Sequence, residues 1–141
     1  MFTVLQPPGW AKPRGYANGI AADGVSIFVA GQIAWDANAQ IVSDDFALQV
    51  RQALMNIVDV LAQAGARPEH IVRMTWYVTS KRAYLDAGRA VGAHYRDIIG
   101  RHFPAMTAVE VTSLMEDRAQ VEIEVTAMMP ATSPLSVGDI R

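Results

Sequence analysis

Two glutamates near the C-terminal end are the residues whose type and spacing could do chemistry. Glu122 and Glu124 alternate with apolar residues, V-E-I-E-V. Side chains alternate between the two faces of a strand, so both carboxylates lie on one face. Neighbouring carboxylates repel each other, so each is solvated, paired with an arginine, or placed to polarise water. The plain alternative is the polar face of an edge strand, and spacing alone favours neither.

The remaining residue types exclude most catalytic apparatus. The chain has no cysteine, and His70, His94 and His102 are not at metal-ligand spacing. It has neither a phosphate-binding glycine loop nor a G-x-S-x-G nucleophile turn. We therefore expect no metal and no cofactor. Trp10, Trp35 and Trp76 suit either a pocket or an interface, and Trp76, on a predicted strand, is expected in the core.

The hydrophobic periodicity predicts the elements that position these residues, in the order β-β-α-β-α-β-β. This order indicates an α+β fold, with two helices packed on one face of a single sheet. Asp23-Gly24 predicts a hairpin turn between the first two strands. The open face, with both glutamates, then meets water or a partner subunit. The strands are expected at residues 15–22, 25–33, 71–79, 105–113 and 120–129, and the helices from the cap at 43–45 to about 64 and from 80 to 99.

Composition bounds the class of protein. The 141 residues predict one domain over residues 1–130, followed by a C-terminal tail at 131–141 that we expect to be partly disordered. With 51% hydrophobic and 18% charged residues, some apolar surface is expected to lie between subunits. The net charge of -2 without a basic stripe indicates no nucleic-acid partner. No apolar run is long enough for a membrane span. We expect a cytoplasmic oligomer.

Several stretches, taken together, resemble one family. They are R-G-Y-A-N-G with Gly15-Tyr16, V-A-G-Q-I with Gly31-Gln32, V-R-M-T-W-Y-V, F-P-A-M-T-A-V-E-V and V-E-I-E. In this order, from about residue 14 to 129, they resemble the reactive intermediate deaminase family, called Rid or YjgF and also labelled endoribonuclease L-PSP. The resemblance implies a chorismate-mutase-like fold and homotrimers with the open sheet faces turned inward. It also implies three ligand clefts, each between neighbouring subunits.

The resemblance also implies a chemistry. Deaminases of this family hydrolyse 2-imino or 2-enamino acids to 2-keto acids and ammonia without a cofactor. Glu122 matches the family glutamate that positions the hydrolytic water, and Tyr16 matches the tyrosine of the cleft. Gly31 matches the backbone that approaches the ligand, and Ala108 matches the residue whose carbonyl contacts it.

One position departs from the family where the substrate carboxylate is bound. The family has an arginine after F-P-A that forks onto this carboxylate, and here the residue is Met106. A methionine offers apolar contact and no charge. Ala30 also stands where the family has a serine. Arg14 and Arg89 are the candidates for a replacement cation, the alternative being solvated surface arginines.

These observations leave three functions open. The first is an imine or enamine deaminase that uses Glu122 and Tyr16 on a metabolite less dependent on a carboxylate contact. The second is a trimer that binds a small molecule in its clefts without chemistry, which Met106 and the tryptophans favour. The third and weakest is an action on RNA, which follows only from a family label.

Overall fold

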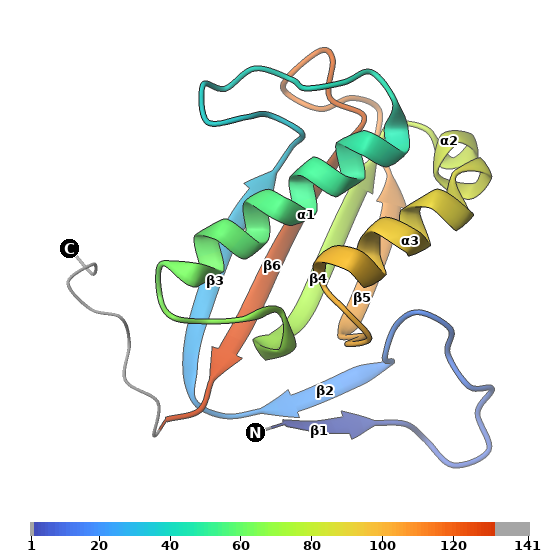
Figure 1. Cartoon of the computed structure of the whole chain (residues 1–141). Helices are drawn as coiled ribbons and strands as arrows, with labels where there is room; N and C mark the ends of the chain where they lie inside the picture. The colour runs from blue at the N-terminus through green and yellow to red at the C-terminus, as the bar shows by residue number, and fades with distance from the viewer. Residues whose placement is uncertain (1, 132–141) are drawn as a thin grey trace.

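The computed structural model describes residues 2–131, and its centre is a four-stranded sheet. β4 (Ile71–Val78) and β5 (Ala105–Glu110) run parallel, and β6 (Val121–Met129) is antiparallel to both of its neighbours, β3 (Val25–Gln32) and β4. Helices α1 (Phe46–Ala62) and α3 (Gly88–Ile98) cover one face, as Figure 1 shows, so the expected α+β class is confirmed. The predicted tail, apart from residue 131, lies outside the described residues. The strands lie in the order β3, β6, β4 and β5.

The core lies between α1 and the sheet. Asp45 begins α1 as predicted, since its side chain accepts a hydrogen bond from the backbone N–H of Leu48 at 3.0 Å. The apolar residues of α1 recur every three or four positions, so one stripe of the helix is buried. β6 alternates strictly between buried and half-buried residues, which gives the sheet one apolar and one polar face. Trp76, expected in the core, is 1% exposed.

The predicted hairpin between residues 15–22 and 25–33 is wrong. β1 (Phe2–Leu5) and β2 (Gly19–Ala22) pair with each other in a separate two-stranded sheet, and β3 pairs with β6. Asp23-Gly24 does bend the chain, with Gly24 at φ 129°. A turn sequence specifies a local bend and does not determine with which strand β2 or β3 pairs. A Cβ at Gly24 would overlap the backbone of Met129, so this glycine packs directly against the end of β6.

The second predicted helix is broken in two. Ser80 caps α2 (Lys81–Asp86) as expected, by accepting from the N–H of Ala83 at 3.0 Å. The chain then leaves helical geometry at Ala87, with φ -89° and ψ 6°, before α3 begins at Gly88. Glycine is a weak helix former, which makes the break inexpensive. α2 and α3 therefore run at an angle to each other, as Figure 1 shows, and residues of both line the cavity beside β5.

One further helix and one strand boundary complete the fold. A short 3₁₀ helix, η1 (Pro68–His70), leads directly into β4. β5 ends at Glu110 rather than at residue 113, because β4, the strand beside it in the sheet, ends at Val78. No helix in residues 2–131 is both long enough and apolar enough to cross a bilayer.

Candidate functional site

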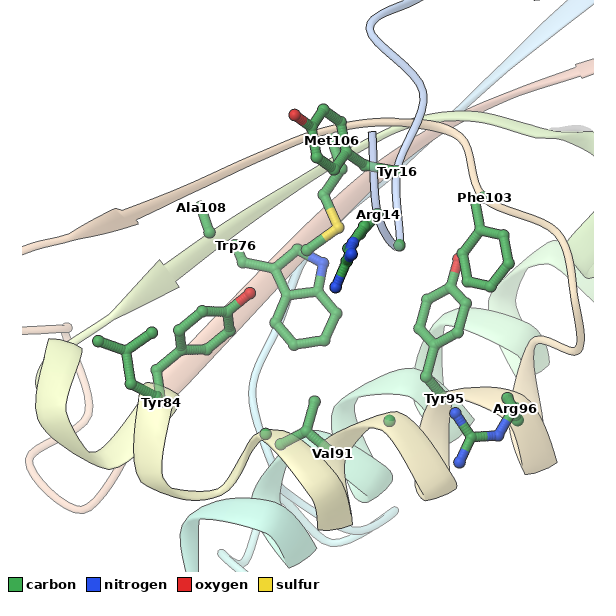
Figure 2. Close-up of a pocket in the computed structure, with 14 residues that line it drawn as sticks. Arg14, Tyr16, Trp76, Tyr84, Val91, Tyr95, Arg96, Phe103, Met106 and Ala108 are labelled. Atoms are coloured by element: carbon green, nitrogen blue, oxygen red, sulfur yellow. The ribbon is translucent and has the colours of Figure 1, made fainter. Parts of the chain in front are cut away.

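A cavity of about 610 Å³ lies between the edge strand β5 and the helices α2 and α3 (Figure 2). Its wall is largely aromatic and apolar, and two guanidinium groups line it. The lining residues include no aspartate or glutamate. Within residues 2–131, neither of these two arginines has a carboxylate within salt-bridge distance. The cavity therefore suits a ligand with an apolar body and a negative charge. Its lining residues are Arg14, Gly15, Tyr16, Trp76, Tyr84, Leu85, Gly88, Val91, Gly92, Tyr95, Arg96, Phe103, Met106 and Ala108.

Four of the predicted site residues meet in this cavity. Two of them, Met106 and Ala108, lie on β5 opposite Met74 and Trp76 of β4 in the parallel register. The side chains of Met106 and Ala108 therefore project from the helix-covered face of the sheet, as those of Met74 and Trp76 do. The segment that holds Arg14 and Tyr16 is fastened to the same edge, because the N–H of Ala17 donates to the carbonyl of Pro104 at 2.9 Å.

Glu122 and Gly31 meet on the other face of the sheet. Gly31 lies where β3 shifts register against β6, a bulge between Val29 and Gln32. A Cβ at Gly31 would overlap the carboxyl group of Glu122, so this carboxylate lies directly over the glycine backbone. Bulges often re-aim side chains beside active sites. One protomer thus brings Glu122 to Gly31 but separates both from the Met106 cavity by the thickness of the sheet.

The two glutamates have different surroundings. Tyr77 Oη donates to Glu124 Oε1 at 2.6 Å, and this bond raises the pKa of the Tyr77 hydroxyl above its ordinary value. No side chain among residues 2–131 donates to the Glu122 carboxylate, which is half-buried opposite Tyr77 in the register of β4 and β6. Glu124 is the paired carboxylate, and Glu122 is the one left able to act on a ligand or a water.

Arg89, the other candidate cation, lies away from both groups. It is exposed on the first turn of α3 and does not line the cavity. Arg96, two turns further along the same helix, does line it. Arg96 was not predicted, because family motifs indicate the cleft residues without showing which face of α3 lines the cavity.

The aromatic wall was also missed. Tyr95 stacks on Phe103 with centroids 5.7 Å apart, and Tyr95 Oη donates to the carbonyl of His102 at 2.6 Å. Burial raises the pKa of Tyr95 above its ordinary value. A signal was present in the sequence: Gly88, Gly92 and Tyr95 recur at the four- and three-residue steps that place residues on one face of a helix. Two glycines on that face leave space beside the aromatic rings.

Comparison with known proteins agrees with the sequence resemblance. The family model described as Endoribonuclease L-PSP matches residues 11–129. The chain belongs to this family. A RutC family protein of Pyrococcus horikoshii is 35% identical over 129 residues, 90% of this chain and 94% of that protein. The predicted relationship to Rid proteins is therefore confirmed.

Two further relatives in this family bear on fold and function. The crystal structure of a protein of unknown function from Yersinia pestis, a member of the Rid family, superimposes with a TM-score of 0.79. It is 30% identical, and the match covers 91% of this chain and 98% of that one. A protein of Salmonella typhimurium named 2-iminobutanoate/2-iminopropanoate deaminase is 32% identical over 108 residues, 74% of this chain and 80% of that protein.

Residues 2–131 hold no cluster of three histidine, aspartate or glutamate side chains that could bind a metal ion. At the two places described above, the chain supplies a carboxylate, a tyrosine hydroxyl, backbone groups and guanidinium groups.

Proposed function

We propose that the protein hydrolyses a reactive imine or enamine metabolite without a cofactor, in clefts between the subunits of a homotrimer. One observation carries the proposal: the Glu122 carboxylate, which no side chain of residues 2–131 pairs with, lies over the Gly31 backbone on the sheet face opposite the ligand cavity. An active site that uses both the Glu122 carboxylate and the cavity therefore needs Glu122 and Gly31 from one subunit and the cavity from a neighbouring subunit. Family members named as deaminases of 2-imino acids support the reaction class.

The open sheet face supports assembly. Phe28 is 77% exposed on β3, beside a shallow depression of about 200 Å³ that Arg73 and Glu124 also line. A large exposed aromatic ring next to polar partners is typical of a surface that another chain covers. An inward-facing sheet would bury this ring. It would also remove Glu122 from bulk water. A carboxylate in such a low-dielectric environment orients a single water molecule more effectively.

The reaction needs only groups that the chain supplies. Glu122 accepts a hydrogen bond from a water molecule and holds it against the imine carbon. As this water adds to the protonated C=N bond, Glu122 takes one of its protons, which gives a neutral carbinolamine, and then passes that proton to the nitrogen. The C–N bond breaks as the C=O bond forms, and the hydroxyl proton leaves with ammonia as ammonium. Arg14 and Arg96 supply positive charge at the cavity, a role that Met106 cannot fill.

A competition assay tests this proposal. An amino-acid oxidase generates a 2-imino acid in place, and semicarbazide traps whatever imine the protein does not hydrolyse first. We expect the native protein to lower semicarbazone formation in proportion to its concentration, while heat-denatured protein does not. If semicarbazone forms at the same rate with native protein, the chain does not hydrolyse that imine.

A second function has its own supporting observation. Where the family resemblance implies an arginine, Met106 puts a neutral thioether inside an aromatic cavity, which favours a trimer that binds a small molecule without chemistry. The same assay separates the two, since a binder that shifts its melting temperature with a ligand but never lowers semicarbazone formation is not a deaminase. We do not propose an action on RNA, because the net charge is -2.

Replacing Gly31 with alanine is expected to lower kcat by about 10²-fold while the melting temperature changes little. The added Cβ overlaps the far end of the Glu122 side chain, which can swing aside without disturbing the backbone. Semicarbazide competition measures the rate, and calorimetry measures the melting temperature. The control is the same change in a Glu122→Ala background, where the Cβ meets no carboxylate and should cost nothing further. A full loss there as well would mean that Gly31 acts independently of Glu122.

A further inference from the structure

Trp76 carries a buried polar group with no partner. The residue is 1% exposed, and its indole Nε1 is the one buried side-chain nitrogen or oxygen in residues 2–131 without a hydrogen bond. The indole N–H can only donate. Buried donors are nearly always satisfied, and an unsatisfied one costs stability unless a ligand or a water accepts from it. The N–H therefore indicates a missing acceptor.

The indole group faces the cavity described above. Trp76 lines it, and in Figure 2 the nitrogen edge of the ring lies on the side toward Met106 and Arg14. Ala108 is its neighbour in the register of β5, so only a short side chain lies beside the indole on that strand. Tyr84 packs edge-on against the ring at 6.2 Å between centroids, which holds the indole in this orientation.

The rest of the cavity is large enough and apolar enough to hold an aromatic ring of a ligand. Its volume of about 610 Å³ is typical of small-molecule sites. A Cβ at Gly88 would meet no atom within 4 Å, so the start of α3 leaves open space there. Val91, Tyr95 and Phe103 supply apolar surface, and no carboxylate lines the cavity to repel an anion.

We infer that Trp76 is a ligand-binding residue, and that the cavity takes a carboxylic acid with a bulky apolar or aromatic group. The carboxylate accepts from Trp76 Nε1–H and from the Arg14 guanidinium, and the ring lies between Tyr84 and Tyr95. This inference rests on the proposed function and deepens it, because it names the substrates as 2-imino acids with large apolar side chains. It also gives the chain a carboxylate contact at the place where Met106 offers none.

Titration calorimetry with three stable probes tests the ligand class. Phenylpyruvate has both groups, pyruvate lacks the ring, and phenylacetone lacks the carboxylate. We expect phenylpyruvate to bind about 10- to 100-fold more tightly than pyruvate, because one buried aromatic ring contributes that much. Phenylacetone should also bind more weakly, by about tenfold or more, because it lacks a charge-assisted hydrogen bond. Equal affinity for phenylpyruvate and pyruvate, or for phenylpyruvate and phenylacetone, would overturn the inference.

Trp76→Phe tests the N–H itself, since it keeps a ring and removes the donor. We expect phenylpyruvate to bind about tenfold more weakly to this variant, while binding to Trp35→Phe, outside the cavity, matches the native protein. Unchanged binding to a folded Trp76→Phe would overturn the assignment.

A measurement that leaves Trp76 in place covers the case in which Trp76→Phe does not fold. In a Trp10→Phe/Trp35→Phe variant labelled with ¹⁵N, the one remaining indole resonance belongs to Trp76. We expect it to shift as phenylpyruvate is added, with the calorimetric Kd, and a resonance that stays in place overturns the inference. Phenylpyruvate binding without imine hydrolysis would refute the proposed reaction but support the ligand class. Hydrolysis without phenylpyruvate binding would refute the ligand class alone.

Discussion

Met106→Arg is expected to raise the rate at which the protein hydrolyses small 2-imino acids by about 10- to 100-fold. The side chain at this position projects into the cavity beside Tyr16 and Ala108, where no carboxylate would pair with a new guanidinium. A charge-assisted hydrogen bond to a substrate carboxylate contributes about 1.5–3 kcal/mol, and a bidentate arginine makes two such bonds. Semicarbazide competition with the imine of pyruvate measures the gain.

A matched variant separates charge from shape in that experiment. Met106→Leu keeps an apolar side chain of similar volume and should leave the rate as it is. A rate for Met106→Arg no higher than that of Met106→Leu would show that position 106 does not reach the substrate carboxylate, against the site described here.

Glu122→Gln is expected to lower kcat by about 10²- to 10⁴-fold, the usual contribution of a positioned general base. Glutamine keeps the shape of glutamate and can lie over Gly31, but it lacks the negative charge that polarises the water. No hydrogen bond from a side chain in residues 2–131 is lost, so the melting temperature should stay close to the native value. Substrate binding, measured with phenylpyruvate, should also be unchanged.

Glu124→Gln is the control for this prediction. It lies two residues along the same strand on the same face, and its side-chain oxygen can still accept from Tyr77. We expect activity within a few-fold of native. If both glutamine variants lost activity equally, the effect would come from the charge of the whole sheet face and not from Glu122.

Residue periodicity predicted the core elements well where one face is buried. The α1 stripe and the alternation of β6 each follow from a single interface, so local pattern and tertiary packing agree. The β2–β3 hairpin was wrong because Asp23-Gly24 determines a local bend, while strand pairing depends on distant partners. The helix break at Ala87 was missed because Gly88 weakens a helix without requiring that it end.

The site divides in the same way. Motif resemblance pointed to Glu122 and Gly31, and to Met106 with Ala108, and the structure places each pair together. The motifs could not show that these two pairs lie on opposite faces of the sheet. That separation depends on the registers in which β4 pairs with β5 and with β6. Nor could the motifs reveal the unpartnered Trp76 N–H, which exists only once the indole ring is buried.

Mixed oligomers test most directly whether one protomer supplies Glu122 and its neighbour supplies the cavity, as we propose. Glu122→Gln lacks the acting carboxylate, and Gly88→Phe fills the cavity of its own chain, so each alone should be inactive. Equimolar co-assembly should restore about a quarter of native activity, because half of the subunits supply a carboxylate and half of their neighbours supply an open cavity. Activity no greater than the sum of the two separate variants would contradict a site shared between subunits.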